Sequence, residues 1–319
     1  MAEYRITGLS PTVIAELIAG VGPLLHEQQH QARLTARPRR RAGGAGAKHR
    51  FVFVDRLLAT LVSLRHGTTH GCWAAGSEWT APPSPVPSVR CGAAAARAAG
   101  LHRRPGTCLG SVAEVIGHLD ADGRTGIIDG TEIRVRRLAA GLKDRDRFVS
   151  GKAKRNAVEA MVLTDAEGRL LFCSPVRPGS CADITQARQL GLAQLLAGGP
   201  FMEILADSGY QGMGAQTGGR VVTPPHRKFK KNAPAWYEER HELRRKAHSS
   251  RRIRVGHGIA HLKNWQALAR HLGRREHMSD IVQAVAGLPS HQQTATLTRS
   301  LRAWSNSGRP RKKDLIHTC

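Results

Sequence analysis

The sequence predicts an α/β protein with a mixed five-stranded sheet, preceded by a small helical region. Two observations favour this fold class. Short apolar runs that alternate with polar residues recur between residues 126 and 223, as half-buried strands require. Apolar residues at helical spacing precede these runs, separate the third from the fourth and follow the last. Two of the runs lead into an aspartate, Asp129 and Asp207, which makes this pair a candidate metal site.

The composition narrows the class of partner. The chain has 319 residues, enough for one large or two modest domains, and it carries a net charge of +25 with a pI near 11.2. Such a charge favours polyanionic partners, of which nucleic acid is the first. A basic protein that acts through charge alone is the alternative, which the two strand-borne aspartates disfavour.

Neither a membrane segment nor a secretion signal is predicted. No apolar run approaches the roughly 20 residues that span a bilayer, and the N-terminus lacks the apolar core of a signal peptide. We therefore expect a cytoplasmic protein that makes no membrane contact. The six cysteines include no Cys-x-x-Cys pair, so neither a zinc ribbon nor a disulfide framework is expected.

The first 70 residues predict two amphipathic helices and a basic link. The first helix begins at Ser10 and Pro11, an N-cap followed by proline, and continues to about residue 25. The second covers residues 51–64. Residues 33–50, between them, are rich in arginine and glycine. This segment is either a flexible link that lies along phosphates or a plain solvated loop.

Residues 71–105 show neither a helical nor a strand period. They contain a proline-rich run at 81–87 and a low-complexity alanine run at 93–99. One interpretation is a proline-rich linker between domains. The other is a reading frame that has slipped by one base, because shifting GC-rich codons can yield the pattern of a helix-turn-helix. The coding DNA of close relatives would separate these two interpretations.

From residue 111 the pattern becomes regular. The expected elements are, in order, a helix at 111–119 with a capping box, strands at 126–136, 156–163 and 170–174, a helix at 182–196, and strands at 202–207 and 221–223. The first three strands form a predicted meander. Prolines stop the last strand, as they stop strands in general.

The last third of the sequence is basic and mostly helical. A cationic run at 226–231 leads to a long helical region at 236–263, which we expect to break near Gly256 and Gly258 because glycine weakens helices. A closing helix is expected at 279–288. The chain thus divides into four predicted parts: a helical region at 1–70, the irregular stretch at 71–110, an α/β domain at 111–290 and a basic disordered tail at 291–319.

Three strands, a helix, two further strands and a closing helix form the order of the ribonuclease-H-like fold, in which the first and fourth strands lie side by side. Six motifs resemble those of the DDE transposases of bacterial insertion sequences. They are IDGTE at 128–132, FVSGK at 148–152, VRPG at 176–179, DSGYQG at 207–212, VTPP at 222–225 and HLKNW at 261–265. The resemblance covers residues 127–288 closely and extends over 52–61, where the family places a helix-turn-helix.

This resemblance implies cutting and joining of DNA at the ends of an insertion sequence, by a nucleoid-associated bacterial protein. In the family, two Mg²⁺ or Mn²⁺ ions are held by three acidic residues. Asp129 and Asp207 occupy the first two acidic positions. The third is a glutamate in a helix, and here Gly256 stands in its place, so the resemblance also implies an impaired copy.

Other acidic residues do not replace the missing glutamate. Glu132 is an odd number of residues from Asp129 and therefore faces the other side of its strand, where surface pairing with arginine is expected. Glu238, Glu239 and Glu242 lie too far upstream of Gly256 to reach its position without rearrangement. His257 is expected on the helix surface or against DNA.

The expected partner is double-stranded DNA, both element ends and target, with a homodimer on DNA as the assembly to test. The basic residues expected to contact it are Lys152, Lys154, Arg155, Lys228, Lys230, Lys231, Arg244, Arg245, Arg251, Arg252 and Arg254. Two other functions compete with the transposase. One is a catalytically silent protein that binds element ends, and the other is a stand-alone ribonuclease-H-like nuclease that never joins strands.

Overall fold

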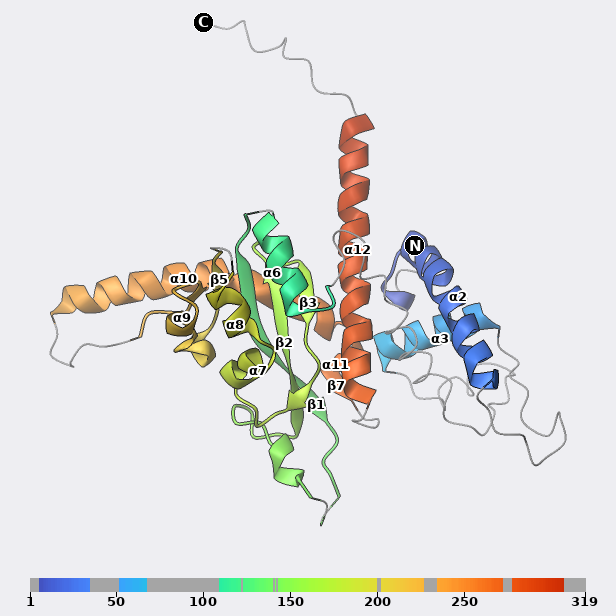
Figure 1. Cartoon of the computed structure of the whole chain (residues 1–319), viewed down its shortest axis with the longest axis horizontal. Helices are drawn as coiled ribbons and strands as arrows, with labels where there is room; N and C mark the ends of the chain where they lie inside the picture. Colours follow the sequence, from blue (N-terminus) through green and yellow to red (C-terminus); the bar gives the residue numbers. More distant parts are fainter. Residues whose placement is uncertain are drawn as a thin grey trace, which may run out of the picture.

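The computed structural model of the chain describes residues 6–34, 52–67, 109–121, 123–139, 141, 143–199, 202–226, 234–271 and 277–306. It shows a mixed sheet with helices on both faces (Figure 1). The predicted α/β class is therefore confirmed. Outside the described residues lie the stretch 71–105, nearly all of the basic link at 33–50, and the three lysines Lys228, Lys230 and Lys231.

The predicted three-stranded meander is present. β1 (Gly126–Val135) pairs antiparallel with β2 (Ala157–Asp165), which pairs antiparallel with β3 (Leu170–Cys173). The tight turn between β2 and β3 uses Gly168 at φ +82°, a conformation that glycine adopts without steric cost. All nine residues of β2 are buried, as expected for a strand covered on both faces.

The first and fourth predicted strands lie side by side, as expected. β5 (Ile204–Leu205) pairs parallel with β1, and β6 (Val221–Val222) pairs parallel with β5. The main path of the sheet is therefore β3-β2-β1-β5-β6. Two short strands were not predicted from the sequence: β4 (Arg177–Pro178), which pairs with β2, and β7 (Arg270–His271), which pairs with β1. Two residues are too few to show a strand period.

Helices on one face of the sheet cover the side chains of Ile128 and its neighbours. They are α6 (Val112–Ala121), α7 (Asp183–Gln189), α8 (Leu192–Ala197) and α9 (Met213–Gln216). The single helix predicted at 182–196 is two helices. Gly191 adopts φ +76° between them, which ends α7 and starts α8 in a new direction.

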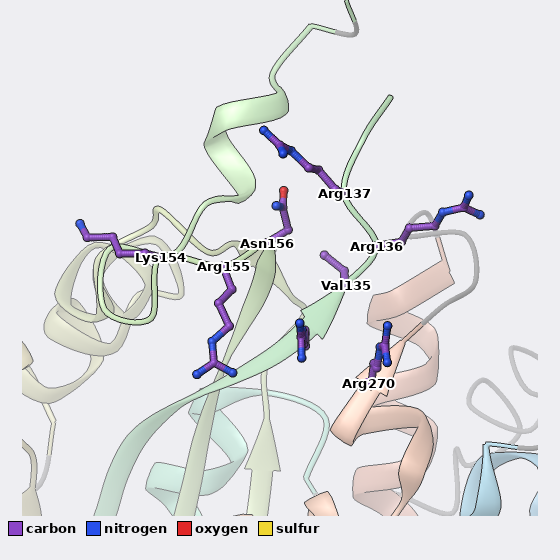
Figure 2. Close-up of a pocket in the computed structure, with 8 residues that line it drawn as sticks. Val135, Arg136, Arg137, Lys154, Arg155, Asn156 and Arg270 are labelled. Atoms are coloured by element: carbon purple, nitrogen blue, oxygen red, sulfur yellow. The ribbon is translucent and has the colours of Figure 1, made fainter. Parts of the chain in front are cut away.

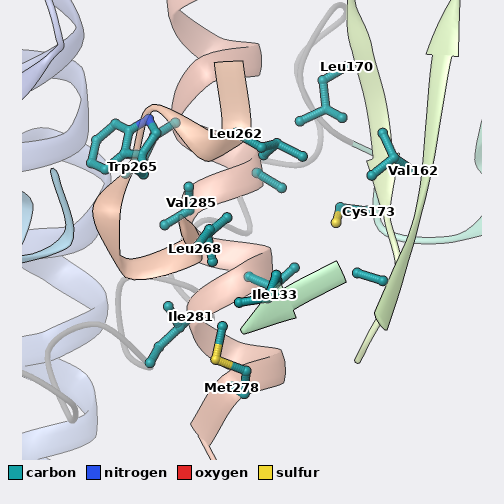
Figure 3. Close-up of a cluster of buried hydrophobic side chains, with 14 of the residues drawn as sticks. Ile133, Val162, Leu170, Cys173, Leu262, Trp265, Leu268, Met278, Ile281 and Val285 are labelled. Carbon is teal, nitrogen blue, oxygen red and sulfur yellow. The ribbon is translucent and has the colours of Figure 1, made fainter. Parts of the chain in front are cut away.

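The opposite face carries the larger core. α10 (Ala235–Lys263), α11 (Gln266–Ala269) and α12 (Met278–Asn306) cover it. Leu262, Trp265 and Met278 pack there in one cluster with Ile133 and Val162 of the sheet (Figure 3).

The two N-terminal helices belong to this same core. α2 (Pro11–Leu34) and α3 (Phe53–His66) confirm the helices predicted from their amphipathic spacing. Buried residues of both, among them Val13 and Leu57, join the cluster around α11 and α12. The guanidinium of Arg65 lies 5.7 Å from the ring centroid of Trp265. Among the described helices, none combines the length and the apolar character needed to cross a bilayer.

α10 is continuous through Gly256 and Gly258, so the predicted break is wrong. A Cβ on Gly258 would stand 2.9 Å from Cγ2 of Thr164 and 3.0 Å from the carbonyl oxygen of Gly168. Tertiary packing thus needs glycine here and keeps the helix intact. α12 also differs from expectation, because it continues through residues 291–306, which the composition had assigned to a disordered tail.

The two α10 glycines allow a matched test. Gly258→Ala should lower the free energy of unfolding by about 1–2 kcal/mol, because overpacking outweighs the gain in helix propensity. Gly256→Ala should raise it by up to about 1 kcal/mol, because no atom lies within 4 Å of its added Cβ. Urea denaturation followed by circular dichroism measures both. Equal and positive shifts would contradict the close packing of α10 on the sheet.

Candidate functional site

Asp129 and Asp207 lie level with each other across the β1–β5 pair. The register pairs Gly126 with Ile204, an offset of 78 residues, and the two aspartates are also 78 apart (204 − 126 and 207 − 129). Asp129 lies two residues after Ile127 and therefore faces the same side of β1. The side chain of Ile127 packs against Val255 of α10. Leu205 packs in the same group, so Asp207, two residues later, follows it on the face toward α10.

The turn after β5 fixes the orientation of Asp207. Asp207 is the N-cap of the 3-10 helix η3 (Ser208–Tyr210), and its Oδ1 accepts a hydrogen bond from the Gly209 N–H at 2.8 Å. Capping roles of this kind are common for aspartate at the end of a strand. The second carboxylate oxygen of Asp207 remains available for another ligand, so the cap is compatible with cation binding.

Asp129 is paired with an arginine of α10. Its Oδ2 accepts from Nη2 of Arg252 at 2.8 Å, and its Oδ1 accepts from the Gly130 N–H at 2.9 Å. Burial raises the pKa of Asp129; Arg252 lowers it and the nearby charge of Asp207 raises it, with a net upward shift. Two carboxylates this close repel each other, and a bound cation relieves that repulsion.

α10 covers the two strands that lead into Asp129 and Asp207. Val255 anchors the helix on Ile127 and Leu205. Gly256 follows it and lies one helical turn beyond Arg252, so the two share a side of the helix. Gly256 is exposed, and apart from the adjacent backbone of α10 no atom lies within 4 Å of the point where its Cβ would stand. A longer side chain would have room at this position.

The carboxylates present suit one hard cation rather than two. Among the described residues, no group of three or more His, Cys, Asp or Glu side chains is arranged to hold a metal ion. Mg²⁺ usually binds through one or two carboxylates together with waters and substrate phosphates, which Asp129 and Asp207 fit. Gly256 of α10 adds no side-chain ligand to this pair.

A second acidic group lies close by, which the sequence analysis did not identify. Asp183 starts α7 and Glu159 lies in β2, and both are almost fully buried. A Cβ on Gly130 would stand 2.8 Å from Oε1 of Glu159 and closer still to Oδ1 of Asp183. Asp183 Oδ2 also lies 2.5 Å from the corresponding point on Gly209. Glycine at both positions lets Asp183 fit between the two strand ends.

Lys152 neutralises this second group. Its Nζ donates to Asp183 Oδ2 at 2.8 Å and lies 3.8 Å from Glu159 Oε1. Lys152 was predicted to contact DNA; its side chain is 61% exposed while it pairs with these acids, so the DNA contact stays a prediction. An acidic residue inside the otherwise apolar strand 157–163 was the signal that could have identified the group.

Ser150 organises the loop that carries Lys152. Its hydroxyl accepts from the backbone N–H groups of Lys152 and Ala153, at 3.1 and 3.0 Å, and donates to Glu132. Glu132 does face away from Asp129, as predicted, because it stands opposite Glu159 in the β1–β2 ladder. The expected pairing of Glu132 with an arginine is replaced by this bond to Ser150.

Burial also shifts the titration of the second group. Burial, and then the neighbouring Asp183, raise the pKa of Glu159 to about 8. The phenol of Tyr210 is fully buried, and its oxygen has no hydrogen-bond partner among the described residues. Burial and the charges of Asp183 and Asp129 raise the pKa of this phenol well above its ordinary value. Glu159 is therefore protonated at neutral pH and the phenol is neutral.

The other residues predicted to contact DNA separate into two sets. Arg252 and Arg251 are held by carboxylates: Arg252 by Asp129, and Arg251 by Glu203, with an Nη1–Oε1 distance of 3.0 Å. The second set consists of exposed cations on α10 and at the loop before β2: Arg244, Arg245, Arg254, Lys154 and Arg155. His257 is exposed on α10, as expected.

Comparison with known families identifies the chain. The family described as DDE superfamily endonuclease matches residues 128–289, just over half of the chain. The chain belongs to the DDE superfamily endonucleases. The match begins one residue before Asp129 and contains Asp207, Asp183 and Gly256, so the whole site lies within it. Comparisons with curated proteins and with solved structures found no match.

Glu159 provides a pH test of this DDE endonuclease. Folded protein keeps the Glu159 proton up to a pH of about 8, whereas unfolded chain releases it above about 4.5, so the free energy of unfolding falls as pH rises through this window. Glu159→Gln stays neutral. The stability of this variant relative to the parent should therefore increase from pH 5 to pH 8, by at most about 4 kcal/mol.

Urea denaturation at pH 5, 6.5 and 8 measures this difference. Glu239→Gln, on the exposed part of α10, serves as the control and should give a constant difference. A constant difference for Glu159→Gln as well would show that Glu159 is ionised in the folded protein.

Proposed function

We propose that the chain is a transposase of an insertion sequence that cleaves and joins DNA, and that this copy is catalytically impaired. The observation that carries the proposal is the level placement of Asp129 and Asp207 on adjacent parallel strands beneath α10. Membership of the DDE endonuclease superfamily supports a DNA substrate. The strand order β3-β2-β1-β5-β6 supports a ribonuclease-H-like catalytic domain. The proposal assigns α2 and α3 to a DNA-binding region.

The DDE endonuclease superfamily generally uses divalent metal ions. In this proposal Asp129 and Asp207 hold one Mg²⁺ or Mn²⁺, and such an ion activates water and stabilises the oxygen that leaves phosphorus. Gly130 and Gly209 fix one oxygen of each aspartate by backbone hydrogen bonds. The other oxygen of each is then directed to a common cation. Binding requires Arg252 to release Asp129.

Gly256 accounts for the proposed impairment. A glutamate here would extend from the same side of α10 as Arg252, into space that the structure leaves open. Such a glutamate would also lie four residues after Arg252 and could accept a hydrogen bond from its guanidinium. Arg252 would then release the carboxylate of Asp129. Glycine does neither, so the proposal assigns the defect to chemistry rather than to DNA binding.

A specific observation favours a second candidate function, that of a catalytically silent DNA-binding protein. Arg252 already occupies Oδ2 of Asp129, with a side chain only 23% exposed. An ion pair sheltered in this way competes with a metal for the same carboxylate, because removing water strengthens the attraction between the two charges. In this alternative the arginine replaces the cation permanently.

Metal binding separates the two candidates. Under the proposal the parent binds one Mn²⁺ weakly, and Asp129→Asn lowers the affinity at least about tenfold because half of the carboxylate pair is lost. Isothermal titration calorimetry measures this directly. Asp120→Asn, at an exposed position of α6, is the matched control and should bind like the parent. Undiminished binding by Asp129→Asn would place the ion elsewhere, and no binding by the parent would favour the silent protein.

Restoring the third acid should restore cleavage. Gly256→Glu should nick supercoiled plasmid with Mn²⁺ about tenfold or more faster than the parent, because the added carboxylate supplies the missing ligand. Full transposition should remain absent, because residues 71–105 show no pattern for recognising element ends.

Two variants control this experiment. Gly256→Gln introduces a side chain of nearly the size of glutamate but without its charge. Gly256→Glu combined with Asp129→Ala lacks the first carboxylate. Neither variant should nick the plasmid. Rapid nicking by the parent, or none by Gly256→Glu, would overturn the assignment of Gly256. Joining of pre-cleaved labelled ends by Gly256→Glu would distinguish a transposase from a nuclease that never joins strands.

A further inference from the structure

The far end of β1 forms a cationic pocket of about 350 Å³. Figure 2 shows that its side chains come from the end of β1 and the residues after it, from the loop before β2, and from β7. Six of the eight lining residues are cations: Arg134, Arg136, Arg137, Lys154, Arg155 and Arg270. The other two are Val135 and Asn156.

The strand register brings like charges together in this pocket. Arg134 stands directly opposite Arg270 in the β1–β7 pair, and on its other side Arg134 pairs with Ala157, two residues after Arg155. Like charges opposite each other in a sheet are destabilising unless an anion lies between them. Among the described residues, no carboxylate forms an ion pair with any of the six cations, and all six are exposed.

The loop before β2 holds its cations in a strained conformation. Lys154 adopts φ +53°, in the left-handed region that residues other than glycine rarely occupy. Hydrogen bonds from Lys154 N–H to the Ser150 carbonyl, and from Ser150 N–H to the Arg155 carbonyl, maintain it. Strain held in place by such bonds is typical of functional loops. This loop directs Lys152 to the buried acids and places Lys154 and Arg155 in the pocket.

From these contacts we infer that the cationic pocket binds the phosphodiester backbone of duplex DNA at a point away from the cleavage site. Its lining offers guanidinium groups, which bind phosphate oxygens in pairs, and no aromatic side chain. Single-stranded nucleic acid is usually bound by stacking on aromatic rings, and protein partners by apolar anchors. The pocket has no aromatic ring and Val135 is its single apolar lining residue, so the phosphates of a duplex fit best.

The position of the cationic pocket shows that it contacts a different part of the DNA from Asp129 and Asp207. Arg134 lies five residues beyond Asp129, or about 17 Å along the strand, and on the opposite face. The scissile phosphate therefore cannot occupy both places. About 17 Å is half a turn of a B-form duplex, or about five base pairs, so one duplex is long enough to contact both places. The inference rests on the proposed function only in taking DNA as the ligand.

The salt dependence of binding tests this inference. The double variant Arg136→Ala with Arg137→Ala should reduce the slope of log Kd against log salt by about 2 for a 20-base-pair duplex of arbitrary sequence, and should raise Kd roughly tenfold at 0.1 M salt, because each lost phosphate contact releases one counterion fewer. Fluorescence anisotropy between 50 and 200 mM NaCl measures both quantities.

Two further double variants make the test specific. Arg136→Lys with Arg137→Lys keeps both charges and should keep the slope of the parent. Arg124→Ala with Arg188→Ala removes two exposed arginines outside the pocket and should change the slope by less than half as much. Thermal unfolding checks that each variant folds like the parent.

The inference would be overturned if the slope fell equally in the pocket variant and in the Arg124 and Arg188 control. Such a result would show that net charge, not the pocket, binds DNA. Weaker binding of single-stranded DNA with unchanged duplex binding would overturn it too. Failure of the pocket and failure of the proposed function give different results. Nicking by Gly256→Glu with an unchanged slope in the pocket variant rejects only the pocket, whereas a reduced slope without any nicking rejects only the proposed cleavage activity.

Discussion

The parallel pairing of β1 with β5 is the contact on which the candidate site depends. The two strands share only a short ladder, Gly126 with Ile204 and Ile127 with Leu205. That register brings together two aspartates 78 residues apart, and it directs both toward α10. A shift by one residue would send Asp207 to the opposite face, because side chains alternate along a strand. Val255 of α10 covers both ladder strands and so stabilises this register.

β1 also separates two charged groups that lie close in space. On one face, Asp129 is paired with Arg252; on the other, Asp183 and Glu159 are paired with Lys152. Gly130 lies between them, and the absence of a side chain there lets Asp183 approach the strand. Buried carboxylates of this kind require a paired cation or a retained proton, and this chain uses both.

α10 links the core, the site and the surface of the protein. Its C-terminal part packs closely on the sheet through Gly258, its middle carries Arg252 and Gly256, and its N-terminal part extends beyond the sheet with exposed basic residues (Figure 1). The two glycines have different physical reasons. Gly258 is required by a close approach to Thr164, whereas Gly256 has open space around it. Only the second can be replaced by a functional side chain without disturbing the core.

The order of the strands and the two aspartates at their ends could be predicted from the sequence, because alternating polarity is a local property of the chain. The basic charge that favours a nucleic-acid partner is equally a property of the sequence, whereas a vacant third acidic position stays a prediction from the family resemblance. The partners of the charges could be read only from the packed structure: Arg252 on Asp129, Lys152 on Asp183, and Arg134 beside Arg270. Each of these pairs joins residues at least 31 positions apart, and side-chain contacts over such separations depend on how the strands and helices pack. For the same reason α10 passes unbroken through two glycines that its local helix propensity would not favour.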